Sequence, residues 1–289
     1  ATATRSAPSR QKTSRGLRIA QYALLTVAAL AAFYPVWFAI LASGRAGDRL
    51  YTFSLAGMFV PTEWTFENYR VMLTERPFLT WMGNSLFIAA ATTVVCLVVA
   101  TSAAFAFSRF RFKGREFWLI FLLAIQAFPA VLALVPQAQI LNALGLYRNP
   151  FGLILAYTSG TLVFCTWNLK GYFDTIPVEL EEAGMVDGCG PIQSFFLIGL
   201  PLARPAIAVT ALFAFMAAWG EFALANVLIP APDSAKTLMV GMFGMANDIG
   251  IPWGYFAAGA VMVIIPVLLI FLSLQRFLEG GLTVGGVKG

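Results

Sequence analysis

Six long apolar runs dominate this chain and limit what it can fold into. They cover approximately residues 19–42, 82–108, 117–141, 151–169, 201–230 and 254–276. A helix needs roughly 20 apolar residues to cross the hydrocarbon core of a bilayer. Only 11% of the 289 residues are charged, against about 25% in an average soluble domain. We therefore predict an all-α membrane protein with six transmembrane helices.

The distribution of lysine and arginine predicts how these helices are oriented. Positively charged residues concentrate in the cytoplasmic loops of membrane proteins. If the N-terminus is cytoplasmic, most of the 19 lysines and arginines fall in cytoplasmic segments. The exceptions, whose charges are balanced by acids in the same outer segments, are Arg45, Arg49, Arg70, Arg76, Arg148 and Lys236. We therefore predict that both termini are cytoplasmic.

Prolines and tryptophans give two further expectations. Trp64 lies within the outer segment 43–80 and Trp81 directly after it, and we expect both side chains at a membrane interface, where tryptophan is enriched. Proline removes a helix hydrogen bond and kinks the helix axis. Kinks are therefore expected at the prolines within the apolar runs, which are Pro35, Pro129, Pro136 and Pro266.

The chain lacks the residues on which most membrane enzymes depend. It has no histidine, the commonest general base near neutral pH. Its three cysteines have no spacing typical of a metal site or a disulfide framework, and it has no G-x-x-x-x-G-K-[ST] phosphate-binding loop. We predict no catalytic residue, no metal site and no cofactor site in this chain. The net charge of +5 fits basic cytoplasmic loops, so we expect a lipid bilayer around the chain and no nucleic acid.

The segment between the fourth and fifth apolar runs predicts a helix-turn-helix on the cytoplasmic side. Pro177 is placed to start a helix, and the helix dipole favours the three glutamates that follow it. Asp187-Gly188 is a strong turn signal, and Gly190-Pro191 begins a second short helix. Ala183 and Gly184 carry little side chain. Another protein surface could therefore approach the first helix closely, and we interpret this segment as a docking element.

The same segment resembles the EAA loop of ABC importer permeases. The family pattern is E-A-A, three residues, G, nine residues, then I-x-L-P, and here it runs from Glu182 to Pro201. The only departure is Gly184 in place of alanine. In that family the loop sits in a cleft of a cytoplasmic ATPase subunit and moves with it. The resemblance implies that the ATPase-coupling residues are Glu182, Ala183, Gly184, Asp187 and Gly188.

The resemblance extends over residues 17–289. Residues 84–115 and the LGLYRN segment at 144–149 look like their counterparts in sugar permeases. Residues 281–289 are similar to the tail of the smaller transmembrane subunit of the maltose/maltodextrin importer, which reaches between two ATPase subunits. The implied ATPase-contacting residues are Gly285, Gly286, Val287, Lys288 and Gly289.

These observations divide the chain into four parts. Residues 1–16 are small, basic and polar, which predicts a disordered tail. Residues 17–80 hold the first transmembrane helix and an extracytoplasmic loop. Residues 81–280 form the permease core, including the coupling loop at 174–201, and residues 281–289 form the C-terminal tail.

The resemblance implies a permease subunit of an ATP-binding-cassette importer in the cytoplasmic (inner) membrane of a bacterium or archaeon. Its partners would be a second homologous permease, two cytoplasmic ABC ATPase subunits that bind ATP and magnesium, and an extracytoplasmic sugar-binding protein. The cargo would be a sugar such as maltose, maltodextrin or trehalose, and the sequence does not choose among them. The alternative is a secondary active transporter, a class that usually shows internal repeats. The two halves of this chain show no such similarity.

Glu221 is the one acid within the fifth apolar run. An ionised carboxylate at the centre of a spanning helix costs roughly 2.5–3.5 kcal/mol on insertion scales, so we expect this side chain to face the protein interior. One interpretation is a polar lining of the sugar path formed by Trp219, Glu221 and Asn226. The other is a structural hydrogen bond between helices or to the partner permease. We expect Glu221 to pack or gate the path rather than to grip sugar.

Overall fold

A computed structural model describes residues 15–45, 56–61, 64–247 and 253–285, and all regular structure in these residues is helical. The longer helices are α1 (Arg15–Ser43), α3 (Phe78–Arg109), α4 (Arg115–Gln126), α5 (Ala130–Ala143), α6 (Pro150–Phe173), α10 (Arg204–Trp219), α12 (Leu238–Asn247) and α13 (Trp253–Gly285). The shorter α-helices are α2 (Glu67–Thr74), α7 (Glu179–Val186), α8 (Pro191–Ser194), α9 (Leu200–Leu202) and α11 (Ala223–Leu228). Single turns of other helix types are η2 (Ala56–Met58), η3 (Phe195–Gly199) and η4 (Asp233–Ala235).

Four of these helices, α1, α3, α6 and α13, are long and apolar enough to cross a bilayer. Two more spans are possible if α4 with α5, and the run Pro191–Leu202 with α10, each count as one. The prediction of six spans therefore corresponds to four continuous candidates and two broken ones. The all-helical fold class is confirmed for the described residues.

The two broken candidates differ from the expected continuous helices. The axes of α4 and α5 meet at 100°, and the halves of the second pair meet at 76°. Pro129 precedes α5 in an extended conformation, with φ −61° and ψ 115°. Its ring disfavours helical backbone in the residue before it, so the helix ends there instead of kinking. Pro35, Pro136 and Pro266 lie inside continuous helices.

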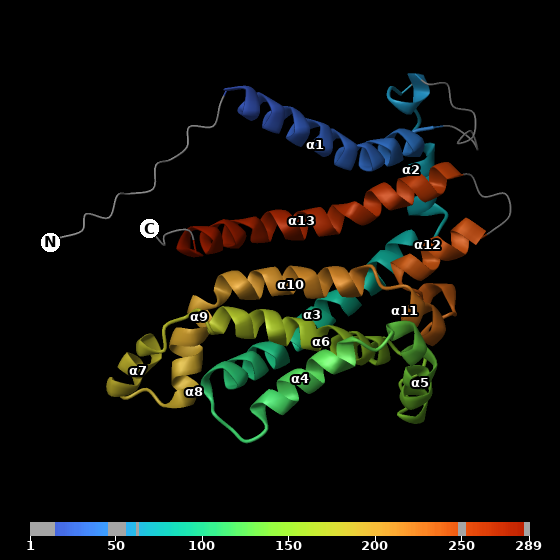
Figure 1. The fold of residues 1–289 in the computed structure, drawn as a ribbon. Helices are drawn as coiled ribbons and strands as arrows, with labels where there is room; N and C mark the ends of the chain where they lie inside the picture. Colours follow the sequence, from blue (N-terminus) through green and yellow to red (C-terminus); the bar gives the residue numbers. More distant parts are fainter. Residues whose placement is uncertain (1–14, 46–55, 62–63, 248–252, 286–289) are drawn as a thin grey trace.

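The helices form one elongated bundle with two distinct ends (Figure 1). Helix α3 packs chiefly against α6 and α10, α13 lies along α10, and α1 lies along α13. Helices α7 and α8 project from one end, which we call the α7 end, while α2, α11 and α12 lie at the other, the α12 end. The start of α1 and the last turn of α13 both lie toward the α7 end.

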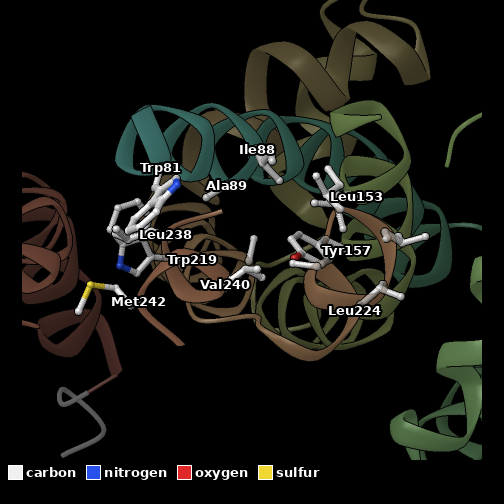
Figure 2. Close-up of a cluster of buried hydrophobic side chains, with 14 of the residues drawn as sticks. Trp81, Ile88, Ala89, Leu153, Tyr157, Trp219, Leu224, Leu238, Val240 and Met242 are labelled. Atoms are coloured by element: carbon white, nitrogen blue, oxygen red, sulfur yellow. The ribbon is translucent and has the colours of Figure 1, made fainter. Parts of the chain in front are cut away.

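The buried core has two parts. The larger cluster lies toward the α12 end and includes Trp81, Tyr157 and Trp219 (Figure 2). The smaller cluster joins α3, α6 and α10 toward the α7 end, around Phe105 and Phe173. Trp81 is buried, and its indole N–H donates to the carbonyl of Asp233 at 2.8 Å. Helix α3 begins at Phe78 and carries this ring into the core, and the expectation that Trp64 and Trp81 lie at the level of a membrane interface stays a prediction.

Large apolar surfaces stay outside the core. Helix α1 is exposed along most of its length and buries only its last three residues, Leu41 to Ser43. Helices α4 and α5 bury one residue each, Leu119 and Leu141. Helix α1 begins at Arg15, and residues 1–14 lie outside the described residues, so the disordered tail at 1–16 stays a prediction.

Candidate functional site

Residues 174–201 fold into two short helical runs joined by a tight turn, which we call the α7–α8 hairpin. Helix α7 ends at Val186, and Gly188 follows with φ +94°, a left-handed conformation that glycine adopts without strain. The amide of Cys189 donates back to the carbonyl of Gly184 at 2.9 Å. Pro191 is the first residue of α8, and the Gln193 side chain accepts a hydrogen bond from Gly190 N at 2.9 Å. The predicted helix-turn-helix is present.

The inner side of the hairpin is fixed to the end of α3 by a buried ion pair. Arg109 Nε lies 2.8 Å from Glu181 Oε1, and the two side chains are 8% and 3% exposed. The same guanidinium donates to the carbonyl of Ile176 at 3.0 Å. Breaking a buried pair by removing one partner usually costs about 3–5 kcal/mol. Helix α3 and the hairpin are therefore held together at both Ile176 and Glu181.

Asp174 extends this network at the end of α6. Its carboxylate accepts hydrogen bonds from Lys170 Nζ and from Ser108 Oγ, each at 2.6 Å. Burial tends to raise the pKa of Asp174, but these hydrogen bonds and the positive charges of Lys170 and Arg115 lower the pKa below its usual value. Asp174 is therefore anionic at neutral pH. Ser108 joins it to Arg109, because it also accepts a hydrogen bond from that guanidinium at 3.0 Å.

Apolar packing closes the rest of the inner side. A Cβ on Gly184 would overlap the Ile198 side chain, so the glycine lets α7 approach the second helical run closely. Phe105 of α3 contacts Phe173 and Phe195, with ring centroids 5.5 and 4.9 Å apart. The expectation that Gly184 leaves room for another protein is therefore corrected. Its missing side chain is used within the chain, by Ile198.

The outer side of the hairpin is open. Glu182, Ala183, Asp187 and Gly188 are exposed, and Val186, at the end of α7, is 88% exposed. Met185 and Ile192 of the same hairpin are 43% and 74% exposed, so the outer side is a surface of exposed apolar side chains mixed with acids. The predicted residues Glu182, Ala183, Asp187 and Gly188 thus share this surface, whereas Gly184 does not.

Sequence reasoning missed Arg109 and Glu181 as a pair. Arg109 counts in the sequence only as one of several basic residues after an apolar run, and Glu181 only as a charge near a helix start. One signal was available: Glu181 and Glu182 are adjacent, so on a helix they point about 100° apart. When one of them faces outward, the other is turned toward the bundle and needs a buried cation.

Glu221 does not lie inside a helix, contrary to the sequence prediction. Helix α10 ends at Trp219, and Glu221 sits in the break before α11. Its carboxylate accepts hydrogen bonds from Leu224 N at 2.8 Å, from Ala225 N at 3.1 Å and from Tyr157 Oη at 2.6 Å. A break at Gly220 lets the carboxylate satisfy the open amides of the next helix. Glu221 therefore joins α6 to α11 by hydrogen bonds.

The other two residues of the predicted sugar path do not join Glu221 on one surface. Trp219 is 4% exposed and stacks on Phe215 with ring centroids 5.6 Å apart. It belongs to the cluster shown in Figure 2, with Trp81 and Leu238. Asn226 is exposed. A transport role for these three residues stays a prediction.

The C-terminal prediction falls mostly beyond what the structure describes. Gly285 is the last residue of α13, and Gly286, Val287, Lys288 and Gly289 lie outside the described residues. Contact between this tail and an ATPase therefore stays a prediction.

Known proteins share this sequence and fold. Residues 97–284 match the family described as binding-protein-dependent transport system inner membrane component. The galactooligosaccharides transport system permease protein of Bacillus subtilis is 37% identical over 93% of this chain and 94% of its own length. The maltose/maltodextrin transport system permease protein of Salmonella typhimurium is 39% identical over 92% of this chain and 93% of its own.

The fold is also that of a solved transporter subunit. A chain from the crystal structure of a bacterial ABC transporter involved in the import of the acidic polysaccharide alginate is 24% identical. It superposes with a TM-score of 0.78 over 93% of this chain and 99% of that chain. The chain thus belongs to the family of binding-protein-dependent transport system inner membrane components, among the ABC permeases of carbohydrate uptake.

Proposed function

We propose that this chain is one transmembrane subunit of an ATP-binding-cassette importer that moves a sugar across the cytoplasmic membrane. In this proposal the α7 end is cytoplasmic, both termini lie on that side, and the membrane holds six spans with α4–α5 and α8–α10 as the broken ones. The cargo is maltose, maltodextrin, trehalose or a related oligosaccharide. Support comes from the relatives, which are named for maltose/maltodextrin and for galactooligosaccharides.

The observation that carries the proposal is the two-sided character of the α7–α8 hairpin. Its inner side is locked to α3 through Arg109 and Glu181, at 2.8 Å, and through Gly184 against Ile198. Its outer side presents Glu182, Val186 and Asp187 to solvent. A hairpin that only closed a loop would not need both features. Docked on an ATPase through its outer side, it would carry α3 with it when the ATPase moves.

The exposed apolar faces fit the partners expected of such a subunit. Helices α1, α4 and α5 expose most of their apolar side chains, which suits contact with a second permease and with lipid. The sugar-binding protein would deliver cargo at the α12 end, while two ATPase subunits bind ATP and magnesium at the α7 end. Closure of the ATPase pair on ATP would pull the hairpins and open the path outward. This chain itself performs no covalent step.

Reconstitution tests the proposal directly. The chain is co-produced with the second permease, the ABC ATPase and the sugar-binding protein of the same organism, and the complex is placed in proteoliposomes. We expect uptake of labelled maltodextrin to require ATP on the α7 side and binding protein on the other. Uptake driven by an ion gradient without ATP would overturn the proposal, and uptake of a different sugar alone would overturn only the choice of cargo.

A further inference from the structure

The loop between α3 and α4 carries three positive charges that form no ion pair in the described chain, although Arg115 is near enough to Asp174 to help lower its pKa. Arg111, Lys113 and Arg115 fall within five residues. None of them lies within 4.0 Å of a carboxylate in the described part of the chain. Their neighbours at the same end are paired, Arg109 with Glu181 and Lys170 with Asp174. The α7–α8 hairpin therefore uses Arg109, while Arg111, Lys113 and Arg115 can still bind an anion.

The loop also has a shape that can hold a ligand. Residues 111–117 line a hollow of about 550 Å³. Gly114 adopts φ +86° at its base and turns the chain back, which brings the basic side chains on either side of it to one hollow. Glu116 is the one acid in the lining, so the hollow keeps a net charge of +2. An anionic group is the complement of this lining.

The position of the loop indicates what kind of anion it meets. The loop lies at the same end of the bundle as α7 and α8 (Figure 1), between two apolar helices. On the α3 side Val98 is 64% exposed, and on the α4 side Phe117 is 63% and Ile120 67% exposed. Tryptophan is enriched at the level of lipid headgroups, and here Trp118, 48% exposed, follows the basic residues. The loop is thus placed where a membrane surface begins.

We propose that Arg111, Lys113 and Arg115 form a binding site for the phosphate headgroup of an anionic phospholipid, with the lipid chains lying along the exposed face of α4. The proposal rests on the orientation in which the α7 end faces the cytoplasmic leaflet. Basic residues near an anionic leaflet each contribute roughly a fivefold gain in binding. Three of them therefore give roughly a 100-fold preference for an anionic lipid over a neutral one.

The test measures lipid binding to the full chain in mixed micelles. Dioleoylphosphatidylglycerol or dioleoylphosphatidylcholine is titrated in, and bound lipid is counted by native mass spectrometry. The test variant is R111Q/K113Q/R115Q, and R111K/R115K preserves the charge. The matched control is R76Q/R148Q/K236Q, which removes the same charge at the α12 end. We expect affinity for phosphatidylglycerol to fall roughly 100-fold in the test variant, and to stay within a few fold of wild type in the other two.

Three outcomes would overturn the lipid site. Equal losses in the test variant and the control would mean that net charge alone governs binding. Displacement of phosphatidylglycerol by inorganic phosphate, at matched ionic strength, would mean that the loop binds free phosphate instead. Unchanged lipid binding in the test variant would mean that these three cations do not hold the headgroup. The proposed transport function fails by a different readout, the absence of ATP-driven uptake by the wild-type complex in any lipid.

Discussion

Arg109 is the residue that fastens the inner side of the α7–α8 hairpin to α3. Its guanidinium donates to Glu181 and Ile176 of the hairpin and to Ser108 of α3, and Ser108 in turn donates to Asp174 at the end of α6. A buried ion pair adds little to stability compared with well-packed apolar residues, but losing one partner strands a charge. The pair is therefore best understood as a specific link between α3 and α7.

Removing one partner of the Arg109–Glu181 ion pair should lower the stability of the chain strongly, whereas replacing both partners by apolar residues should not. We predict that Arg109→Met lowers the stability of the chain by about 3–5 kcal/mol because Glu181 stays buried without a cation. The double change R109M/E181L should recover most of that loss. Lys170→Met, which breaks the more exposed pair with Asp174, should cost at most about 1 kcal/mol. Thermal unfolding in detergent measures all three, and a small effect of Arg109→Met would show that the pair is not buried in the protein.

The double variant R109M/E181L then distinguishes the effect of the ion pair on stability from its effect on coupling to the ATPase. If R109M/E181L folds and assembles, we expect weaker stimulation of the ATPase by sugar-loaded binding protein, because the apolar pair can slide where the ion pair cannot.

Glu221 gives a second prediction at this scale. Glu221→Gln keeps the shape of the side chain but leaves one oxygen to serve three donors, Leu224 N, Ala225 N and Tyr157 Oη. We expect the complex to assemble and its transport rate to fall, since α11 loses part of its anchor on α6. Sugar uptake in proteoliposomes is the measurement. Tyr157→Phe is the matched variant, because it removes a single donor and should have a smaller effect. Transport at the wild-type rate in Glu221→Gln would contradict a packing or gating role.

At the scale of elements, the sequence predicts the hairpin well because its signals are local. Asp187-Gly188 and Gly190-Pro191 each dictate a backbone conformation, and the structure has both. What the sequence could not predict depends on contacts between distant segments. The hydrogen bond from Trp81 to Asp233 and the anchoring of Glu221 by Tyr157 join segments far apart in the chain. The close fit of Ile198 over Gly184 depends on how the two helical runs of the hairpin pack. Hydropathy alone likewise predicts a single helix where the structure has α4 and α5 at 100° to each other.

The turn itself can be tested without changing any contact. A side chain on Gly188 would meet no atom within 4 Å, but φ there is +94°, where a side chain costs roughly 1–2 kcal/mol. Gly188→Val should therefore move α8 relative to α7 and reduce ATPase stimulation by loaded binding protein. Gly190→Val is the control, because φ −72° and ψ 165° suit valine. Full stimulation in Gly188→Val would remove the hairpin from the coupling path.

At the scale of the whole molecule, the two ends of the bundle differ in chemistry. The α7 end carries the paired and unpaired cations Arg109, Lys170, Arg111, Lys113 and Arg115. The apolar faces of α1, α4 and α5 lie between the ends and stay uncovered by this chain. These uncovered faces suit contact with lipid and with the proposed second permease, and the charge asymmetry supports the proposal that the α7 end is cytoplasmic.

That orientation makes a prediction that depends on no partner. In a chain whose native cysteines are replaced by serine, Asp187→Cys places a thiol at the α7 end and Ser234→Cys at the α12 end, both at exposed positions. A membrane-impermeant maleimide should label only the second in right-side-out vesicles and only the first in inverted ones. Restoring Cys96, which is fully buried, should give no labelling in either and serves as the control. Labelling of both exposed positions from one side would mean that the bundle does not span the membrane along its long axis. The reverse pattern would place the α7–α8 hairpin outside the cell, where no cytoplasmic ATPase could reach it.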